Sequence, residues 1–283
     1  QFLSRLAGAT GLCAVVPAGN EGASGKHYRG TLTAQDIVEF FVAEGESSVF
    51  LNIWGTSPDV MTLSLDSPLG NTLERLPLSA MRINQYPLPR EASRVSIRYY
   101  NQGAPLAYIR IDFPTPGLWR LHVYGDSIVS GPYDIWLPIQ SFSRPETRFL
   151  KPAPEVTITI PGTQTRIITV GGYQPLIGSL YENTGRGPNR YGLLRPTLVA
   201  PAIDIYGPTG ASYRALSGTS AAAALTAGAA AQFLQYGIVQ GNEPEMNTLT
   251  IQARMIRCAA RRLDLSYPNE QWGFGTLDVS LCL

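Results

Sequence analysis

A serine stands where a tight turn meets a stretch made almost wholly of alanine, in LSGTSAAAALTAGAAAQFL, residues 216–234. Gly218 and Thr219 precede Ser220, and the alanines after it predict a long helix that begins at or beside the serine. The first backbone N–H groups of a helix have no intrahelical partner and lie in a positive field. Such groups can stabilise an alkoxide, or the oxyanion that forms when a serine attacks a carbonyl.

Two interpretations of Ser220 follow from these residues. The serine is a nucleophile, or it is an ordinary N-cap residue on a buried alanine helix. Under both interpretations the small alanine side chains let neighbouring strands and helices approach closely. The helix is then buried, and the position of the serine is fixed.

The pattern of apolar and polar residues changes along the chain. Near the start, FLSRLAG has apolar residues at helical spacing, and LCAVV is a short apolar run of the kind found in buried parallel strands. After about residue 156 strand-like and helical patterns alternate again. VTITIPG, RIITVGGY and TLVAPAIDIYG are strand-like, and TIQARMIRCAARRL is helical.

Residues from about 30 to 155 have the pattern of an all-β region. In one run Trp119, Leu121 and Val123 fall on one face, with polar residues between them. Turn sequences such as SPD, PLG and PTPG separate the runs. The strand-like runs are VEFFVAEG, SVFLNIWG, VMTLSLDSP, RVSIRYYNQG, YIRIDFP, WRLHVYGD and YDIWLP. Short strands at this spacing predict a sandwich or a jelly roll.

This order predicts an α/β fold with an inserted all-β domain. We expect residues 1–29 and 156–283 to form one parallel-sheet domain, and residues 30–155 to form a jelly-roll-like domain inserted into it.

Composition excludes several classes of partner. The chain has 283 residues, 44% of them hydrophobic and 15% charged, with a formal net charge of +1 and no dense run of lysine and arginine. Nucleic acid and anionic membrane surfaces therefore fit poorly as partners. No apolar run reaches the length of a membrane span, so we expect none.

The chain has few cysteines and histidines that could coordinate a metal ion. Cys13, Cys258 and Cys282 are too few and too scattered for a disulfide framework, and no Cys-x-x-Cys pair suggests zinc. We expect no reliance on disulfide bonds. No dense Asp/Asn loop suggests calcium, and we expect no metal and no cofactor.

The alanine segment resembles a known family. GTSAAAALTAG is similar to the nucleophile segment of the subtilisin-like serine proteases, the subtilases, although Ala224 stands where the family usually has proline. VVPAGNEG, residues 15–22, resembles the segment that carries the oxyanion-hole asparagine of the family, here Asn20. From the residues alone, the favoured interpretation of Asn20 is a turn residue that tolerates a left-handed conformation between glycines. The matching residues of the first segment are Gly218, Thr219, Ser220, Ala227 and Gly228.

Three weaker segments follow in the family's order. TVGGY at 169–173, RPTLVAPAIDI at 195–205 and WGFGTLDV at 272–279 resemble subtilase segments, with Thr197 and Ala202 as departures. The resemblance implies a serine endopeptidase that acts on a protein or peptide through an acyl-enzyme. It implies Ser220 as nucleophile and Asn20 in the oxyanion hole. The residues expected to contact substrate are Ala18, Gly19, Gly218 and Thr219.

Segments of the predicted inserted domain limit the resemblance to one branch of the subtilases. IWGTSPD at 53–59 and YDIWLP at 133–138 look like segments of the clostridial Csp proteases. That branch acts in spore germination by cleaving the precursor of a cortex-degrading hydrolase. The resemblance therefore suggests a bacterial spore as the location.

Two triad members are absent from the expected place. In subtilases the Asp and His precede the oxyanion asparagine, and only about twenty residues precede Asn20 here. His27 follows Asn20, in the wrong order, and His122 falls on the polar face of a predicted strand. The chain thus looks like the C-terminal part of a protease, held by an N-terminal part that supplies Asp and His. Serine without a base is a weak nucleophile.

Three explanations stay open: a nicked protease, a truncated chain, and a pseudoprotease without a working triad. The rival function is accordingly a catalytically inactive subtilase-like protein that acts in signalling or scaffolding. A third function is carbohydrate binding by aromatic side chains of the β region, where Trp54 and Trp136 lie.

Overall fold

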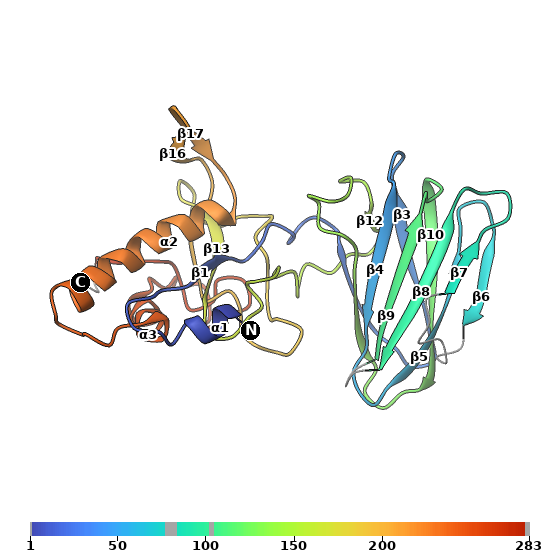
Figure 1. Cartoon of the computed structure of the whole chain (residues 1–283), viewed down its shortest axis with the longest axis horizontal. Coiled ribbons are helices and arrows are strands. Elements are labelled where there is room, and N and C mark those ends of the chain that lie inside the picture. The colour runs from blue at the N-terminus through green and yellow to red at the C-terminus, as the bar shows by residue number, and fades with distance from the viewer. Residues whose placement is uncertain (1, 77–83, 102–104, 281–283) are drawn as a thin grey trace. The chain divides into compact units, whose positions relative to one another are not determined.

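The parallel strand pairs of this chain lie in a different part of it from its two large antiparallel sheets. The computed structural model describes residues 2–76, 84–101 and 105–280. It divides the chain into two units (Figure 1). Unit 1 consists of Gln1–Ala23 and Pro154–Leu283, and unit 2 consists of Ser24–Ala153.

β13 (Ile168–Gln174) is the centre of the parallel sheet in unit 1. β1 (Val15–Pro17) and β15 (Leu198–Pro201) lie on either side of it, both parallel to it, with Val16 opposite Thr169 and Gly171 opposite Val199. The first five residues of β13 are buried. A strand covered on both faces explains why this segment is an apolar run rather than an alternating one. The other strands of unit 1 are β14 (Ser179–Leu180), β16 (Ile205–Thr209) and β17 (Ser212–Leu216).

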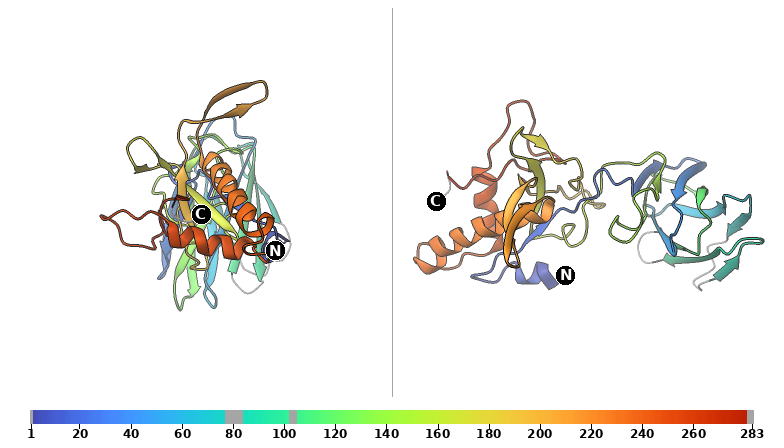
Figure 2. Two further views of the ribbon diagram at one scale, coloured as in Figure 1. Left: turned by 90° about the vertical axis from the view of Figure 1, so that its left-hand side faces the viewer. Right: turned by 90° about the horizontal axis from the view of Figure 1, so that it is seen from above.

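α2 (Thr219–Leu234) packs on this sheet against β1, β13 and β15, as Figures 1 and 2 show. Its buried side consists of small residues and one large one, Phe233, which is fully buried. The small side chains allow the helix to lie close to the strands. The buried residues of α2 are Thr219, Ala222, Ala223, Thr226, Ala229, Ala230 and Phe233.

The opposite face of α2 is apolar but exposed. Leu225 is 42% exposed, and Ala224, Gly228 and Ala231 are exposed beside it. A helix that is apolar all round is normally buried on all sides. Within unit 1 this face has no cover among the described residues.

α2 continues into a π-helical turn, η1 (Gln235–Val239), and the combined segment Thr219–Val239 is long and apolar enough to cross a membrane. That criterion is one of length and composition only, and core helices of folded proteins meet it as well.

Two further helices complete unit 1. α1 (Phe2–Leu6) is short, and α3 (Thr248–Cys258) begins at a capping box in which the Asn247 side chain accepts hydrogen bonds from Leu249 and Thr250. Ile251 and Met255 of α3, which are four positions apart and so lie on one face of the helix, are buried.

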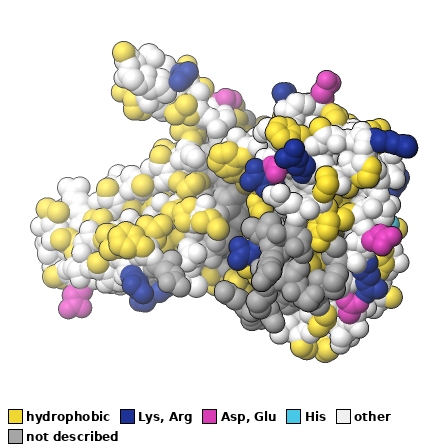
Figure 3. All heavy atoms as spheres, turned by 45° about the vertical axis from the view of Figure 1, so that its right-hand side comes forward, with side chains coloured by type: hydrophobic (Ala, Val, Ile, Leu, Met, Phe, Trp, Pro, Cys, Tyr) yellow, Lys and Arg dark blue, Asp and Glu magenta, His cyan; other side chains and the backbone are white. Residues whose placement is uncertain are grey.

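The hairpin of β16 and β17 stands out from the rest of unit 1 (Figure 3). All five residues of β17 are exposed, including Tyr213, and Tyr206 of β16 is exposed as well. Leu216, the last residue of β17, lies just before the turn into α2.

The prediction of a strand at VTITIPG, residues 156–162, is wrong. Val156 has a φ of 55°, a conformation that strands do not contain, and the Thr159 N–H donates to the Ala18 carbonyl oxygen at 2.9 Å. The segment is a loop that binds another loop. Its apolar residues Val156 and Ile158 are nevertheless buried, which is why its composition resembles that of a strand.

Unit 2 consists of two antiparallel sheets. The strand order is β12-β3-β10-β5-β6 in one and β2-β11-β4-β9-β8-β7 in the other. The strands are β2 (His27–Thr31), β3 (Gln35–Val42), β4 (Ser48–Trp54), β5 (Val60–Asp66), β6 (Thr72–Leu76), β7 (Asn84–Pro87), β8 (Arg94–Asn101), β9 (Pro105–Asp112), β10 (Gly117–Ser127), β11 (Pro132–Trp136) and β12 (Arg148–Phe149).

One hydrophobic core joins the two sheets, because alternate residues of strands from both sheets belong to a single buried cluster. Trp119, Leu121 and Val123 of β10 are fully buried in it, on the face that the sequence predicts. Phe40 of β3 stacks on Trp119, with ring centroids 6.4 Å apart.

The limits of unit 2 differ from those expected for the inserted region. We expected residues 30–155, whereas the second unit starts at Ser24 and ends at Ala153. The reason is β2, which pairs antiparallel with β11, so that His27 lies opposite Trp136. The short polar segment HYRGT gives no clear strand pattern by itself.

The expectation that the chain does not rely on disulfide bonds is wrong at one position. Cys258, the last residue of α3, is disulfide-bonded. Wide separation in sequence says nothing about separation in space, so cysteine spacing alone could not reveal this bond. Cys13 is a free thiol.

Burial raises the pKa of the Cys13 thiol to about 12. At pH 8 such a thiol is almost entirely protonated, and the thiolate is the reactive form. We therefore expect iodoacetamide to leave Cys13 unmodified in the native protein at pH 8 and to modify it fully in concentrated urea, as measured by peptide mass spectrometry. Rapid modification of the native protein would contradict the burial of this thiol.

Candidate active site

The loop after β1 brings Asn20 to the start of α2. The loop is fixed in unit 1 by backbone hydrogen bonds from Ala18 N–H to the Val170 carbonyl and from Gly185 N–H to the Gly19 carbonyl, both at 2.8 Å. Gly19 has a φ of 97°, and a Cβ there would collide with the Thr159 side chain. Both the conformation and the space at this position therefore require glycine.

Thr219 connects this loop to α2. Its hydroxyl donates to Asn20 Oδ1 at 3.1 Å and accepts from the Gly19 N–H at 3.2 Å. Its backbone N–H also donates to Asn20 Oδ1, at 3.0 Å. Thr219 is fully buried, so these bonds are shielded from solvent.

These contacts orient the Asn20 amide. The carbonyl end of the side chain accepts both hydrogen bonds from Thr219, so the other end of the same planar group, Nδ2, points away from Thr219. An amide NH2 held in this way is a hydrogen-bond donor of fixed direction.

Ser220 is exposed, at the second position of α2. Gly218 before it has a φ of 135°, and its N–H donates to the Ala202 carbonyl at 2.7 Å. No described residue hydrogen-bonds to the Ser220 hydroxyl. The Ser220 N–H belongs to the first helical turn, whose donors lack intrahelical acceptors. The serine thus presents its hydroxyl to solvent beside an unsatisfied N–H and the positive end of a helix.

The residues expected to contact substrate divide into two kinds. Ala18 and Thr219 are fully buried, and their polar groups bind Val170, Thr159, Gly19 and Asn20 inside unit 1. In this chain they position the loop. Gly19 and Gly218 supply the two backbone bends that let the loop and the helix start approach each other.

Two positioning residues escaped sequence reasoning, Thr159 and Gly185. Each donates a backbone hydrogen bond to the loop before Asn20. The glycines of GRG, residues 185–187, are a signal for close backbone contact, since a Cβ at Gly185 would lie against the Ala18 carbonyl. Nothing in the residue type of Thr159 marks it.

Both histidines lie in unit 2, bound to carboxylates. His27 is 1% exposed, with Nε2 3.0 Å from Asp134 Oδ1 and Nδ1 3.2 Å from the Ala153 carbonyl oxygen, and its ring stacks on Trp136. His122 Nε2 lies 2.8 Å from Asp66 Oδ2. Each histidine therefore has a structural role inside the β unit.

Among residues 2–76, 84–101 and 105–280, no three His, Cys, Asp or Glu side chains gather as a metal site would require. The expectation that the chain binds no metal stays a prediction.

Comparisons with known proteins agree with the sequence motifs. Residues 150–275 match the model of the subtilase family. The structure of the CspB protease of Clostridium perfringens superposes with a TM-score of 0.90 at 28% identity, over 98% of this chain and 59% of that one. The chain thus has a subtilase-like fold and spans less than two thirds of that relative. No curated protein matches the chain.

Two other solved structures are more distant. The prenylagaramide maturation protease PagA gives a TM-score of 0.38 at 20% identity, over 44% of each chain. The PatG macrocyclase bound to a peptide gives 0.37 at 19% identity, over 43% of this chain and 37% of that one.

Replacing Thr219 by valine keeps the shape of the side chain and removes its hydroxyl. The Gly19 N–H loses its acceptor, and Asn20 Oδ1 loses the hydrogen bond that the Thr219 hydroxyl donates. Leaving a buried donor without a partner costs about 1–3 kcal/mol, and we expect a loss of that size in the free energy of unfolding measured with urea.

Thr226→Val is the matched control, because Thr226 is equally buried in the same helix and its hydroxyl only donates to the Ala222 carbonyl, one turn earlier. A loss for Thr219→Val no larger than for this control would show that the contact between loop and helix contributes nothing to stability.

Proposed function

Because residues 150–275 match the model of the subtilase family and the chain superposes on the CspB protease, we propose that it is the part of a serine endopeptidase that carries the nucleophile, Ser220, and the oxyanion-hole donor, Asn20. One observation carries the assignment of the site. An exposed serine at the N-terminus of α2 follows directly after the residue that fixes the asparagine amide.

In the proposed reaction the Ser220 hydroxyl oxygen attacks the carbonyl carbon of a peptide bond while a histidine takes its proton. The carbonyl oxygen becomes an oxyanion that accepts hydrogen bonds from the Ser220 N–H and Asn20 Nδ2. The intermediate collapses to an acyl-enzyme, and the leaving amine takes the proton from the histidine. Water then attacks the ester by the same route and releases the acid.

We propose that the histidine and its aspartate come from an N-terminal part of the same protease. Two features of unit 1 support a missing neighbour. The exposed apolar face of α2, around Leu225 and Gly228, needs cover. β1 also pairs with a single described strand, β13, which leaves its other edge open for a further parallel strand.

We propose further that unit 2 is a jelly-roll-like domain inserted into the subtilase domain. The support is its two antiparallel sheets, in which strands distant in sequence are neighbours, as β3 is of β10 and β4 of β11. Such pairing is typical of Greek-key and jelly-roll sandwiches rather than of simple meanders.

The physiological substrate proposed is the precursor of a cortex-degrading hydrolase in a bacterial spore. The support is the resemblance to the Csp branch, including the similarity to the Clostridium perfringens CspB protease.

Labelling with a fluorophosphonate tests the assignment of the nucleophile. We expect stoichiometric label on Ser220, mapped by peptide mass spectrometry, when the chain is complexed with its N-terminal part, and none after Ser220→Ala. Ser217→Ala is the matched control, since Ser217 is an exposed serine nearby whose hydroxyl accepts from the Asp204 N–H. A folded complex that takes no label would favour the inactive, scaffolding function.

Removing the amide of Asn20 tests the oxyanion hole. We expect Asn20→Ala to lower kcat for a peptide substrate by about 10²–10³-fold, a magnitude that comes from the equivalent asparagine of subtilisin itself. Active-site titration with the same fluorophosphonate counts competent serines, so it separates this effect from misfolding. An unchanged kcat would remove Asn20 from the mechanism.

A further inference from the structure

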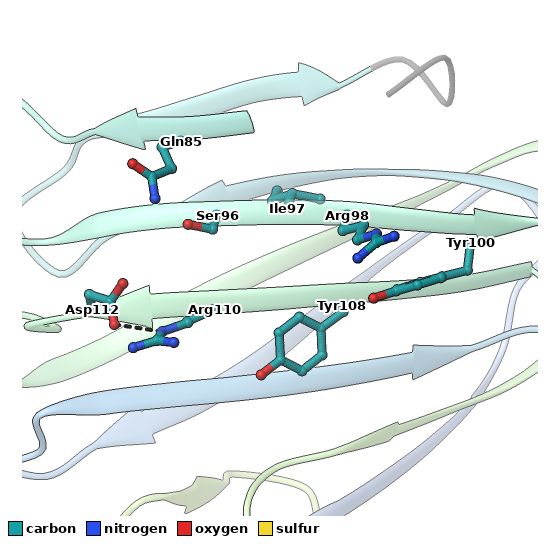
Figure 4. A pocket seen from close by; sticks show the side chains of 8 residues that line it. All are labelled: Gln85, Ser96, Ile97, Arg98, Tyr100, Tyr108, Arg110 and Asp112. Atoms are coloured by element: carbon teal, nitrogen blue, oxygen red, sulfur yellow. Dashed lines mark hydrogen bonds and ion pairs between the residues drawn. The ribbon is translucent and has the colours of Figure 1, made fainter. Parts of the chain in front are cut away.

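The outer face of the six-stranded sheet in unit 2 contains a hollow that the protease chemistry does not use. Its volume is about 240 Å³, and it lies over β7, β8 and β9 (Figure 4). The lining residues are Gln85, Ser96, Ile97, Arg98, Tyr100, Tyr108, Arg110 and Asp112.

The strand register explains the hollow. Gln85, Ser96 and Arg110 are direct neighbours across β7, β8 and β9, and Arg98 lies opposite Tyr108. Every second side chain along a strand projects from the same face, and residues directly opposite on neighbouring strands share that face. These five residues therefore form one surface. Ser96 is the smallest of them, and the long side chains around it leave a depression above its hydroxyl.

Aromatic rings form one side of this surface. Tyr108 of β9 stacks on Phe50 of β4, with ring centroids 5.7 Å apart and planes inclined by 29°. The guanidinium of Arg110 lies 5.4 Å from the Phe50 ring, and that of Arg98 lies 4.5 Å from the Tyr100 ring. Stacking on rings fixes each guanidinium and leaves its N–H edges available.

The two arginines differ in charge compensation. Arg110 Nε binds Asp112 Oδ1 at 2.7 Å. No carboxylate among the described residues pairs with Arg98, and no described residue hydrogen-bonds to Arg98, Ser96 or Gln85 through the side chain. The lining therefore carries a net charge of +1, and three of its polar side chains have no hydrogen-bond partner in the described part of the chain.

We propose that this hollow binds a sugar unit that bears a carboxylate, within an acidic polysaccharide. The Arg98 fork matches a carboxylate, which accepts two parallel N–H bonds from it. The Tyr108 ring offers a flat apolar face against which the C–H face of a sugar ring packs, while Ser96 and Gln85 reach its hydroxyls. Aromatic rings beside a few convergent polar groups are a feature of small-molecule sites, and Tyr100 and Tyr108 supply the rings here.

An acidic peptide is the alternative ligand, and the geometry favours the sugar. A glutamate side chain presents a carboxylate but no flat face for Tyr108. It also has no hydroxyl groups for Ser96 and Gln85.

The experiment measures binding of hexagalacturonate to the whole chain by isothermal titration calorimetry, with a neutral galactose hexamer and a hexaglutamate peptide as comparisons. We expect hexagalacturonate to bind at least 10-fold more tightly than either. Arg98→Gln is expected to weaken binding at least 10-fold, because glutamine keeps a polar side chain but loses the charge and the fork.

Arg120→Gln is the matched control. Arg120 is an exposed arginine on β10 of the other sheet, paired with Glu39, and its loss should leave the affinity unchanged. Ser96→Val, which fills the hollow with a residue that strands favour, should weaken binding without unfolding the protein. Equal binding of hexaglutamate, an equal effect of Arg120→Gln, or absence of binding would each overturn the proposal.

Discussion

The hydroxyl group of Thr219 is the contact on which the candidate site depends. It accepts a hydrogen bond from the Gly19 N–H and donates one to Asn20, and so joins two segments whose residues are 200 positions apart in the sequence, as Gly19 and Thr219 are. Each segment is fixed by a rigid element, since β1 is paired in the sheet and α2 is packed on it. The asparagine and the serine are thereby positioned by a strand and a helix rather than by loops alone.

Close packing at this point has an energetic cost. An alanine removes far less apolar surface from water than a leucine or a phenylalanine does, and the hydrophobic contribution to stability is proportional to that area. The core of unit 1 is rich in alanine, with Phe233 as its one large fully buried side chain from α2. The core of unit 2 contains Trp119, Tyr133, Phe40 and Phe149, all nearly inaccessible. Unit 1 therefore gains less stability from its own core than unit 2 does. It depends more on a neighbour that covers the exposed face of α2.

Sequence patterns identified the elements whose own residues specify them. The alternation in β10 places Trp119 in the core whatever surrounds it, and the alanine run of α2 predicts a helix from propensity alone. Patterns failed where a partner decides the conformation. β2 is a strand because β11 lies beside it, and residues 156–162 form a loop because Ala18 takes the Thr159 N–H.

The candidate site follows the same division. Ser220 and Asn20 stand in motifs that a reader of the sequence can find. Thr219 links these two motifs through hydrogen bonds, and this role cannot be found from the sequence because it depends on the two segments being close in space. The same holds for Cys258, whose disulfide no spacing rule predicts.

The two ends of unit 2 are hydrogen-bonded neighbours, since the Ala153 N–H donates to the His27 carbonyl at 2.9 Å and the His27 ring faces the Ala153 carbonyl. A folded unit whose two ends are bonded to each other in this way shortens the effective length of the chain. Once it has formed, the residues on either side of it are held close together. Gly19 and Thr159, remote in sequence, then become near neighbours along the effective contour of the polypeptide. The entropy of closing the intervening chain is lost when unit 2 folds and not when unit 1 does. In kinetic terms unit 1 then folds as a much shorter chain of lower contact order.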